Sequence, residues 1–246
     1  MTYSREYIRL PKSGLMPDSG IERRKLNDIF WINLIHLHLI KFYREYDIED
    51  LKKLIAKEKS KTTRKHIEDL IKDYMKTWFE KNDKRIFREG ILINLESKVK
   101  YNDVGFYDIK FQHSDWVNLK SKQVKYYSIE CKNLTLDATK NHISEYVYVN
   151  SKKDGGVYRY FNGKYAQNQN FGGMLGFVLD ENLHLIKDKI IEKLKLPFDK
   201  PPQGNLIENG ILLNSIEGND FTFNSIHKRF DGNFTLHHFL FDFNKY

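Results

Sequence analysis

The sequence contains a single cysteine and no apolar run long enough to cross a membrane. The one cysteine, Cys131, excludes an internal disulfide, as is usual in a reducing compartment. The most apolar run, Ile29 to Ile40, has about 12 residues and includes polar side chains, whereas a membrane helix needs roughly 20 apolar residues. The N-terminus carries charges and no apolar region typical of a signal peptide. We therefore expect a cytoplasmic protein without a membrane partner.

What is present is the composition of a soluble globular protein. Of 246 residues, 40% are hydrophobic and 30% charged, and aromatic residues reach 14%, so large rings should supply much of the core. The net charge is +8, and the isoelectric point is near 9.2. A basic surface attracts polyanions, and nucleic acid is the first of these to consider. Charge alone favours such a partner only slightly.

The N-terminal part of the chain is predicted to be helical. The segment from Ser19 to Glu22 has the form of a capping box and should begin a buried helix that ends near Tyr46. A shorter helix is predicted from Asp47 to Lys59. His36 and His38 lie two positions apart, hence on different helical faces, and cannot chelate one metal together. We expect both histidines to be packing or surface residues.

The segment from His66 to Lys81 has the clearest helical pattern in the chain. Its apolar residues recur three or four positions apart and form one broad stripe. Glu68 falls at the edge of this stripe, whereas Asp69 and Asp73 fall on the opposite, solvent-facing side. Glu68 is thus the acidic side chain of this helix that should point toward the core.

After this helix the pattern changes to the alternation of strands. Three consecutive strands are predicted, and their short connections favour an antiparallel meander: Gly90–Leu95, Gly105–Gln112 and Lys125–Leu134. A helix is predicted at Ala138–Tyr148 and a fourth strand at Met174–Leu179. A helix capped by Asp180 should then run to Leu194, and two or three tail strands follow from Gly210 onward. Gly172 and Gly173 should make a tight turn before the fourth strand.

This order of elements predicts an α/β (α+β) fold. We expect a central mixed β-sheet flanked by helices, with extra strands at the C-terminal end. The domain division that we predict is a helical N-terminal region, residues 1–62, packed on a core domain, residues 63–246.

The ends of the second and third predicted strands carry charged side chains. Asp108 lies on the polar face of one strand, and Glu130 and Lys132 lie on the polar face of the next. Charged groups at the end of an apolar strand are costly to bury unless they have partners. An Asp and a Glu on a shared face of neighbouring strands offer oxygen ligands to Mg²⁺ or Mn²⁺, and the Cys131 carbonyl is a further ligand. Such a metal activates water for phosphodiester hydrolysis, and Lys132 would neutralise charge at the phosphate.

These residues resemble the motif of the PD-(D/E)xK, or restriction-endonuclease-like, nuclease superfamily. Asp108 precedes Glu130-Cys131-Lys132 by 22 positions, and the order helix, three strands, helix, strand matches the family core. The resemblance implies that Asp108 and Glu130 bind metal and that Lys132 is catalytic. Glu68 corresponds to a glutamate that many members carry on the first core helix. The proline of the motif is absent here.

The resemblance also implies a Mg²⁺-dependent endonuclease that acts on DNA, with a role in bacterial restriction or anti-phage defence. Cutting of both strands often uses a homodimer. Family members tend to bring polar residues from beyond the third strand into the site. The candidates for contacts with nucleic acid are Lys140, Arg159 and Lys164.

Several alternatives stay open at this point. In the simplest alternative, Glu130 and Lys132 form only a structural ion pair. In a second alternative, the chain has the nuclease fold but is an inactive module that binds DNA or a protein. Asp103 replaces Asp108 as the metal ligand if the strand register differs by a few residues. A metal-independent ribonuclease would use tail histidines as acid and base, although packing in the core or a surface position is the simpler interpretation for His227, His237 and His238.

Overall fold

The computed structural model describes residues 27–243 apart from short gaps. The gaps are 61–65, 99–105, 119, 137, 141, 150–151, 153, 163, 167–168, 180–181, 199–203 and 231. The predicted capping box at Ser19–Glu22 and the alternative ligand Asp103 therefore lie outside the described residues. The predicted start of the first helix at this box is wrong, because the helix begins at Asp28 and is capped by Asn27, whose Oδ1 accepts a hydrogen bond from the N–H of Phe30.

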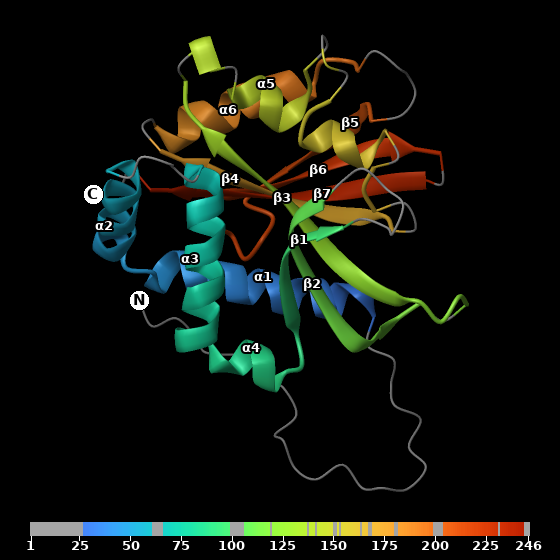
Figure 1. Ribbon diagram of the computed structural model, residues 1–246. Helices are drawn as coiled ribbons and strands as arrows, with labels where there is room; N and C mark the ends of the chain where they lie inside the picture. Colours follow the sequence, from blue (N-terminus) through green and yellow to red (C-terminus); the bar gives the residue numbers. More distant parts are fainter. Residues whose placement is uncertain are drawn as a thin grey trace, which may run out of the picture.

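Seven strands form one mixed sheet in the order β1-β2-β3-β4-β7-β6-β5 (Figure 1). The first three strands are antiparallel neighbours, β3, β4 and β7 are parallel, and β7, β6 and β5 are again antiparallel. The strands are β1 (Leu92–Lys98), β2 (Phe106–Val117), β3 (Val124–Leu134), β4 (Phe171–Val178), β5 (Leu206–Leu213), β6 (Thr222–Arg229) and β7 (Gly232–Asp242).

Helices cover both faces of this sheet (Figure 1). On one face His36 of α1 contacts Tyr127 of β3, and on the other Tyr146 of α5 contacts His238 of β7. None of the described helices is long and apolar enough to span a membrane. The helices are α1 (Asp28–Glu45), α2 (Ile48–Lys59), α3 (Ile67–Asn82), α4 (Lys84–Arg88), α5 (His142–Val147) and α6 (Leu183–Leu194), with 3₁₀ turns η1 (Ala138–Lys140) and η3 (Val157–Tyr160).

The order of the predicted elements is largely confirmed. The antiparallel meander, the buried fourth strand and three tail strands are all present, within one mixed sheet flanked by helices. Two further helices differ from the prediction. The helix α4 follows α3 without having been predicted, and α6 is capped by Asn182, whose Oδ1 accepts hydrogen bonds from two backbone amides, rather than by Asp180.

The prediction of a turn at Gly172 and Gly173 is also wrong, because both lie inside β4. Neither has the positive φ that would require glycine. Instead they leave room for rings: a Cβ on Gly172 would lie 2.4 Å from the Tyr160 ring, and one on Gly173 would lie 2.8 Å from the Tyr127 hydroxyl. The two glycines thus allow a tyrosine to pack on each face of the strand.

The helix α1 belongs to the same core as the sheet. Tyr43 stacks on Phe241 of β7 with ring centroids 4.5 Å apart, and buried side chains of α1 and the strands form one continuous cluster. The boundary predicted at residue 62 stays a prediction, and among the described residues before it α1 packs directly on the sheet.

Candidate functional site

The charged cluster lies where β2 and β3 separate. Toward the start of β2 and the end of β3, the last residues that pair are Ile109 and Ile129. Beyond this pair, the N–H of Cys131 donates a hydrogen bond of 2.7 Å to Oδ2 of the Asp108 side chain instead of to a backbone carbonyl of β2. Its Oδ1 accepts from Lys72 of α3 at 2.9 Å. Asp108 therefore connects three elements at this point: β2, β3 and α3.

Glu130 is fully buried, yet its carboxylate is well provided with donors. Oε1 contacts Lys132 at 2.7 Å and accepts from Arg159, and Oε2 accepts from the Tyr165 hydroxyl at 2.9 Å. Burial raises the pKa of Glu130, while the charge of Lys132 lowers it. A buried carboxylate of this kind is tolerated only because its oxygens are hydrogen-bonded to cations.

Lys132 contacts two oxygen atoms of this cluster. Its Nζ lies 2.7 Å from Glu130 Oε1 and 2.8 Å from the carbonyl oxygen of Cys131. Burial lowers the pKa of Lys132, but the carboxylates of Glu130, Glu68 and Asp108 raise it by more, so the ammonium stays charged. This is a position at which the protein stabilises a positive charge.

The first turns of α3 contribute three further charged groups. Lys72, which is 3% exposed, lies 2.8 Å from Asp69, 2.9 Å from Asp108 and 3.8 Å from Glu68. Burial raises the pKa of Glu68 to about 7, although Lys132 opposes the effect. Glu68 thus faces the cluster as predicted. The prediction that Asp69 lies on the solvent-facing side is wrong, because its carboxylate forms an ion pair with the buried Lys72 one turn later.

The segment after α5 supplies the remaining groups. Arg159 contacts both Glu130 and Asp154, and Lys164 lies 3.4 Å from Asp154. Two of the three residues predicted to contact nucleic acid are thereby joined to the cluster through carboxylates. The third, Lys140, is exposed on η1 and is outside the contacts described above.

The donor atoms can be compared with the requirements of Mg²⁺. Among the described residues, no three Asp, Glu, His or Cys side chains are grouped so as to hold a metal ion. Glu130 and the Cys131 carbonyl converge on one cation, Lys132 Nζ, while Asp108 is directed to Lys72. Because Mg²⁺ commonly uses one or two carboxylates and keeps several waters, these hard oxygen donors fit the ion in kind. A metal would have to displace at least one ammonium group.

Three members of the cluster were missed in the sequence: Lys72, Tyr165 and Asp154, whose carboxylate contacts Arg159 and Lys164. Lys72 follows Glu68 by one helical turn, so its place on the same face of α3 was detectable from spacing. Tyr165 gave no such signal. It reaches Glu130 through an irregular segment whose path depends on tertiary packing.

The tail histidines are buried packing residues, as the simpler interpretation predicted. His227 and His238 are fully buried on β6 and β7, and His237 is 9% exposed. Burial lowers the pKa of His227 and of His237 to about 4. Ser225 Oγ lies 2.7 Å from both His227 Nε2 and His238 Nε2, which links the two rings in the core. His36 and His38 are buried as well.

No family model, curated protein or solved structure matches this chain. The resemblance to the PD-(D/E)xK nucleases therefore rests on the residues of the cluster.

Proposed function

We propose that the protein is a metal-dependent endonuclease that hydrolyses phosphodiester bonds in nucleic acid, and that its substrate is DNA. The observation that supports this best is the position of Lys132 Nζ between Glu130 and the Cys131 carbonyl, within the charge field of Glu68 and Asp108. A point that holds one cation between a carboxylate oxygen and a carbonyl oxygen offers the hard oxygen donors that a divalent ion needs. A homodimer and a role in restriction or anti-phage defence are further parts of the proposal.

Five residues of the cluster have a role in this proposal. Asp108, Glu130 and the Cys131 carbonyl would hold Mg²⁺ or Mn²⁺, which when bound lowers the pKa of water and polarises the phosphate. Lys132, released from Glu130, would then neutralise charge at the scissile phosphate. Glu68, with its raised pKa, accepts or releases a proton near neutral pH beside this lysine.

Arg159 and Lys164 are the groups best suited to the nucleic-acid backbone. Both lie in the segment next to Glu130, and both share the carboxylate of Asp154. Phosphate oxygens can replace that carboxylate as the acceptor, since Arg binds both in a bidentate way. The net charge of +8 favours the approach of a polyanion.

The proposal is tested by incubating wild type, Lys132→Ala and Glu130→Gln with single- and double-stranded DNA and RNA, with and without Mg²⁺ or Mn²⁺. We expect cleavage by wild type only with metal. Because each change removes charge from the reacting phosphate or the metal, we expect losses of at least about 100-fold in both variants. Gel analysis of the products measures this.

Lys189→Ala, an exposed change on α6, is the matched control and should cleave like wild type. Thermal unfolding of each variant separates loss of chemistry from loss of fold. Cleavage that continues in EDTA, or equally in both site variants, would contradict the proposal.

A second candidate is an inactive nuclease-fold module that binds DNA or a protein partner. It is favoured by the pairing of each acid with a lysine or arginine: Asp108 with Lys72, and Glu130 with Lys132 and Arg159. This candidate predicts binding without cleavage at any metal concentration.

A further inference from the structure

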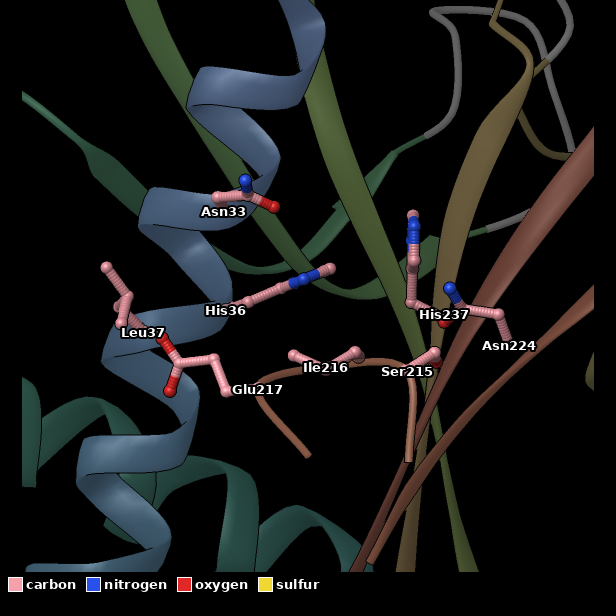
Figure 2. Close-up of a pocket in the computed structure, with 8 residues that line it drawn as sticks. All are labelled: Asn33, His36, Leu37, Ser215, Ile216, Glu217, Asn224 and His237. Atoms are coloured by element: carbon pink, nitrogen blue, oxygen red, sulfur yellow. The ribbon is translucent and has the colours of Figure 1, made fainter. Parts of the chain in front are cut away.

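The cavity on the α1 side of the sheet is unsuited to a polyanion. It has a volume of about 340 Å³ and lies between α1 and the turn that joins β5 to β6, where Figure 2 shows His36 pointing toward His237. Among the described residues that line it there is no lysine or arginine, and Glu217 supplies a carboxylate that repels phosphate. Tyr127 of β3 contacts His36 on this side, and alternation along β3 directs Glu130 to the other side. A nucleic-acid substrate should therefore bind on the side that carries the charged cluster.

Lys110 is a cation near this cluster that has no acidic partner. Asp108 and Lys110 lie two positions apart on β2, so their side chains leave the same face of the strand, about 7 Å apart. Lys110 Nζ lies 4.9 Å from the centroid of the Tyr126 ring, and no carboxylate of the described residues forms an ion pair with it. Burial lowers the pKa of Lys110, and no acidic group opposes this effect. The cations of the cluster itself each contact a carboxylate, whereas Lys110 can bind a phosphate without displacing one.

Phe230 has the most exposed large apolar side chain of the described residues, at 83%. It directly follows Arg229, the last residue of β6, which pairs with Gly232 of β7 across the hairpin turn. Arg229 holds the base of this turn, because its Nη1 donates to the Ala166 carbonyl oxygen at 2.9 Å and its guanidinium lies 4.7 Å from the centroid of the Phe234 ring. A ring held in water on a fixed turn lacks the favourable free energy of burial, which a flat partner surface would supply.

Contacts through Ala166 connect Lys110 with the hairpin that carries Phe230. The N–H of Ala166 donates to the Tyr107 hydroxyl at 3.1 Å, and this hydroxyl lies 2.7 Å from that of Tyr126, the ring beneath Lys110. The carbonyl of Ala166 accepts from Arg229, next to Phe230. Both groups thus border the segment that also carries Arg159 and Lys164.

The register of the sheet gives the separation of the two groups. Lys110 pairs with Ser128, and the same row reaches Ser225 of β6, four strands away. Phe230 lies five residues beyond Ser225 along the chain. The spacing of residues and strands then places Phe230 roughly 25 Å from Lys110, a distance that a few nucleotides can bridge.

We propose that the substrate is a single strand of DNA, in which Lys110 binds the phosphate next to the scissile one and Phe230 stacks on an unpaired base farther along. Proteins that bind single strands combine basic groups along the backbone with aromatic rings on which bases stack. The bases of a duplex already stack on one another and leave no free face for Phe230. This inference rests on the proposed function and narrows its substrate.

The test is fluorescence anisotropy with full-length protein in EDTA, so that metal-dependent cleavage does not interfere. The probes are a labelled single strand of mixed sequence and the duplex that it forms with its complement. We expect the single strand to bind at least about fivefold more tightly, since stacking on one ring contributes that much. Phe230→Ala should remove this preference and leave duplex binding unchanged, whereas Phe230→Trp, which keeps an aromatic ring, should bind like wild type. Leu185→Ala, an exposed apolar change on α6, is the matched control.

The phosphate contact of Lys110 is tested through the salt dependence of binding. Each phosphate contact of a single strand contributes about 0.7 to the slope of log K against log salt concentration. Lys110→Gln should therefore reduce the slope by about this amount, and Lys189→Gln, exposed on α6, should keep the slope of wild type. Thermal unfolding of each variant shows that the fold is intact.

The inference is overturned if the duplex binds as tightly as the single strand, if Phe230→Ala binds the strand like wild type, or if Lys110→Gln keeps the wild-type slope. These outcomes are distinct from those of the cleavage test. The expected binding pattern without cleavage in metal would contradict the endonuclease alone. Metal-dependent cleavage without this binding pattern would contradict the single-strand inference alone.

Discussion

At the scale of the residue, Glu68 holds its proton unusually tightly for a carboxylic acid. It lies 3.8 Å from Lys72, beyond hydrogen-bonding distance, so burial outweighs the attraction of the neighbouring lysines. The pKa of Glu68 rises to about 7. In the unfolded chain the same group would have a pKa near 4.5. Between these values the folded protein binds a proton that the unfolded chain has lost.

The free energy of unfolding should therefore fall as pH rises from about 4.5 to 7, through this group alone, and should level off once the folded protein has also lost the proton. The effect is at most about 3 kcal/mol, since one pKa unit corresponds to about 1.36 kcal/mol. Glu68→Gln, which has the neutral form at every pH, should lose this dependence. Urea unfolding of both proteins in EDTA between pH 5 and 8 measures the difference, and Glu80→Gln, exposed near the end of α3, is the control. Parallel pH profiles for wild type and Glu68→Gln would refute this.

At the scale of the element, β4 depends on glycines that have no conformational role. The Tyr160 hydroxyl donates to the carbonyls of Ser128 and Gly173, at 3.1 and 2.8 Å, which holds the ring over Gly172. A methyl group at Gly172 would meet a ring that is fixed at both ends.

Gly172→Ala should therefore destabilise the fold by about 1–3 kcal/mol, as expected for overpacking of a core. The readout is the midpoint of chemical denaturation. Asn233→Ala on the exposed part of β7 is the control and should change stability by no more than about 0.5 kcal/mol. An unchanged midpoint in Gly172→Ala would mean that the Tyr160 ring is free to move.

The elements also differ in how far their sequences determine them. Periodicity identifies α3 and the strands β2 and β3 because each buries one face against the core. It cannot identify α4, which has only five residues, or the glycines of β4, whose partner ring lies elsewhere in the chain.

Local periodicity likewise predicts only part of the candidate site. Alternation along β3 places Glu130 and Lys132 together, but the partners that satisfy Glu130 come from long-range packing. The direction of Asp108 toward Lys72 depends on where the β2–β3 ladder ends, which no local pattern encodes.

At the scale of the whole molecule, buried histidines make the fold sensitive to acid. The pKa of His227 and of His237 is lowered to about 4, and burial lowers that of His36 and His238 as well. Because the unfolded chain binds protons near pH 6.5 and the folded chain does not, their contribution to stability is present above pH 6.5. It is lost as pH falls toward 4.

We expect the free energy of unfolding to fall steeply between pH 6.5 and 4, by up to about 3 kcal/mol for His227 and the same for His237. His227→Gln should be less stable at neutral pH but should show a shallower acid dependence. Denaturant titrations at several pH values test this, with the exposed His184→Gln as control. An acid profile in His227→Gln as steep as that of wild type would contradict the assignment.

The position of β7 between β4 and β6 has a consequence for the order in which the chain can assemble during synthesis. Until residues 232–242 have left the ribosome, the strands β1 to β4 and the hairpin β5–β6 share no ladder in the described sheet. The parallel edge of β4 stays open, and Tyr43 of α1 lacks its stacking partner Phe241. Open edges of this kind invite pairing with other chains. The edges of β4 and β6 therefore stay unpaired during synthesis until β7 pairs with both.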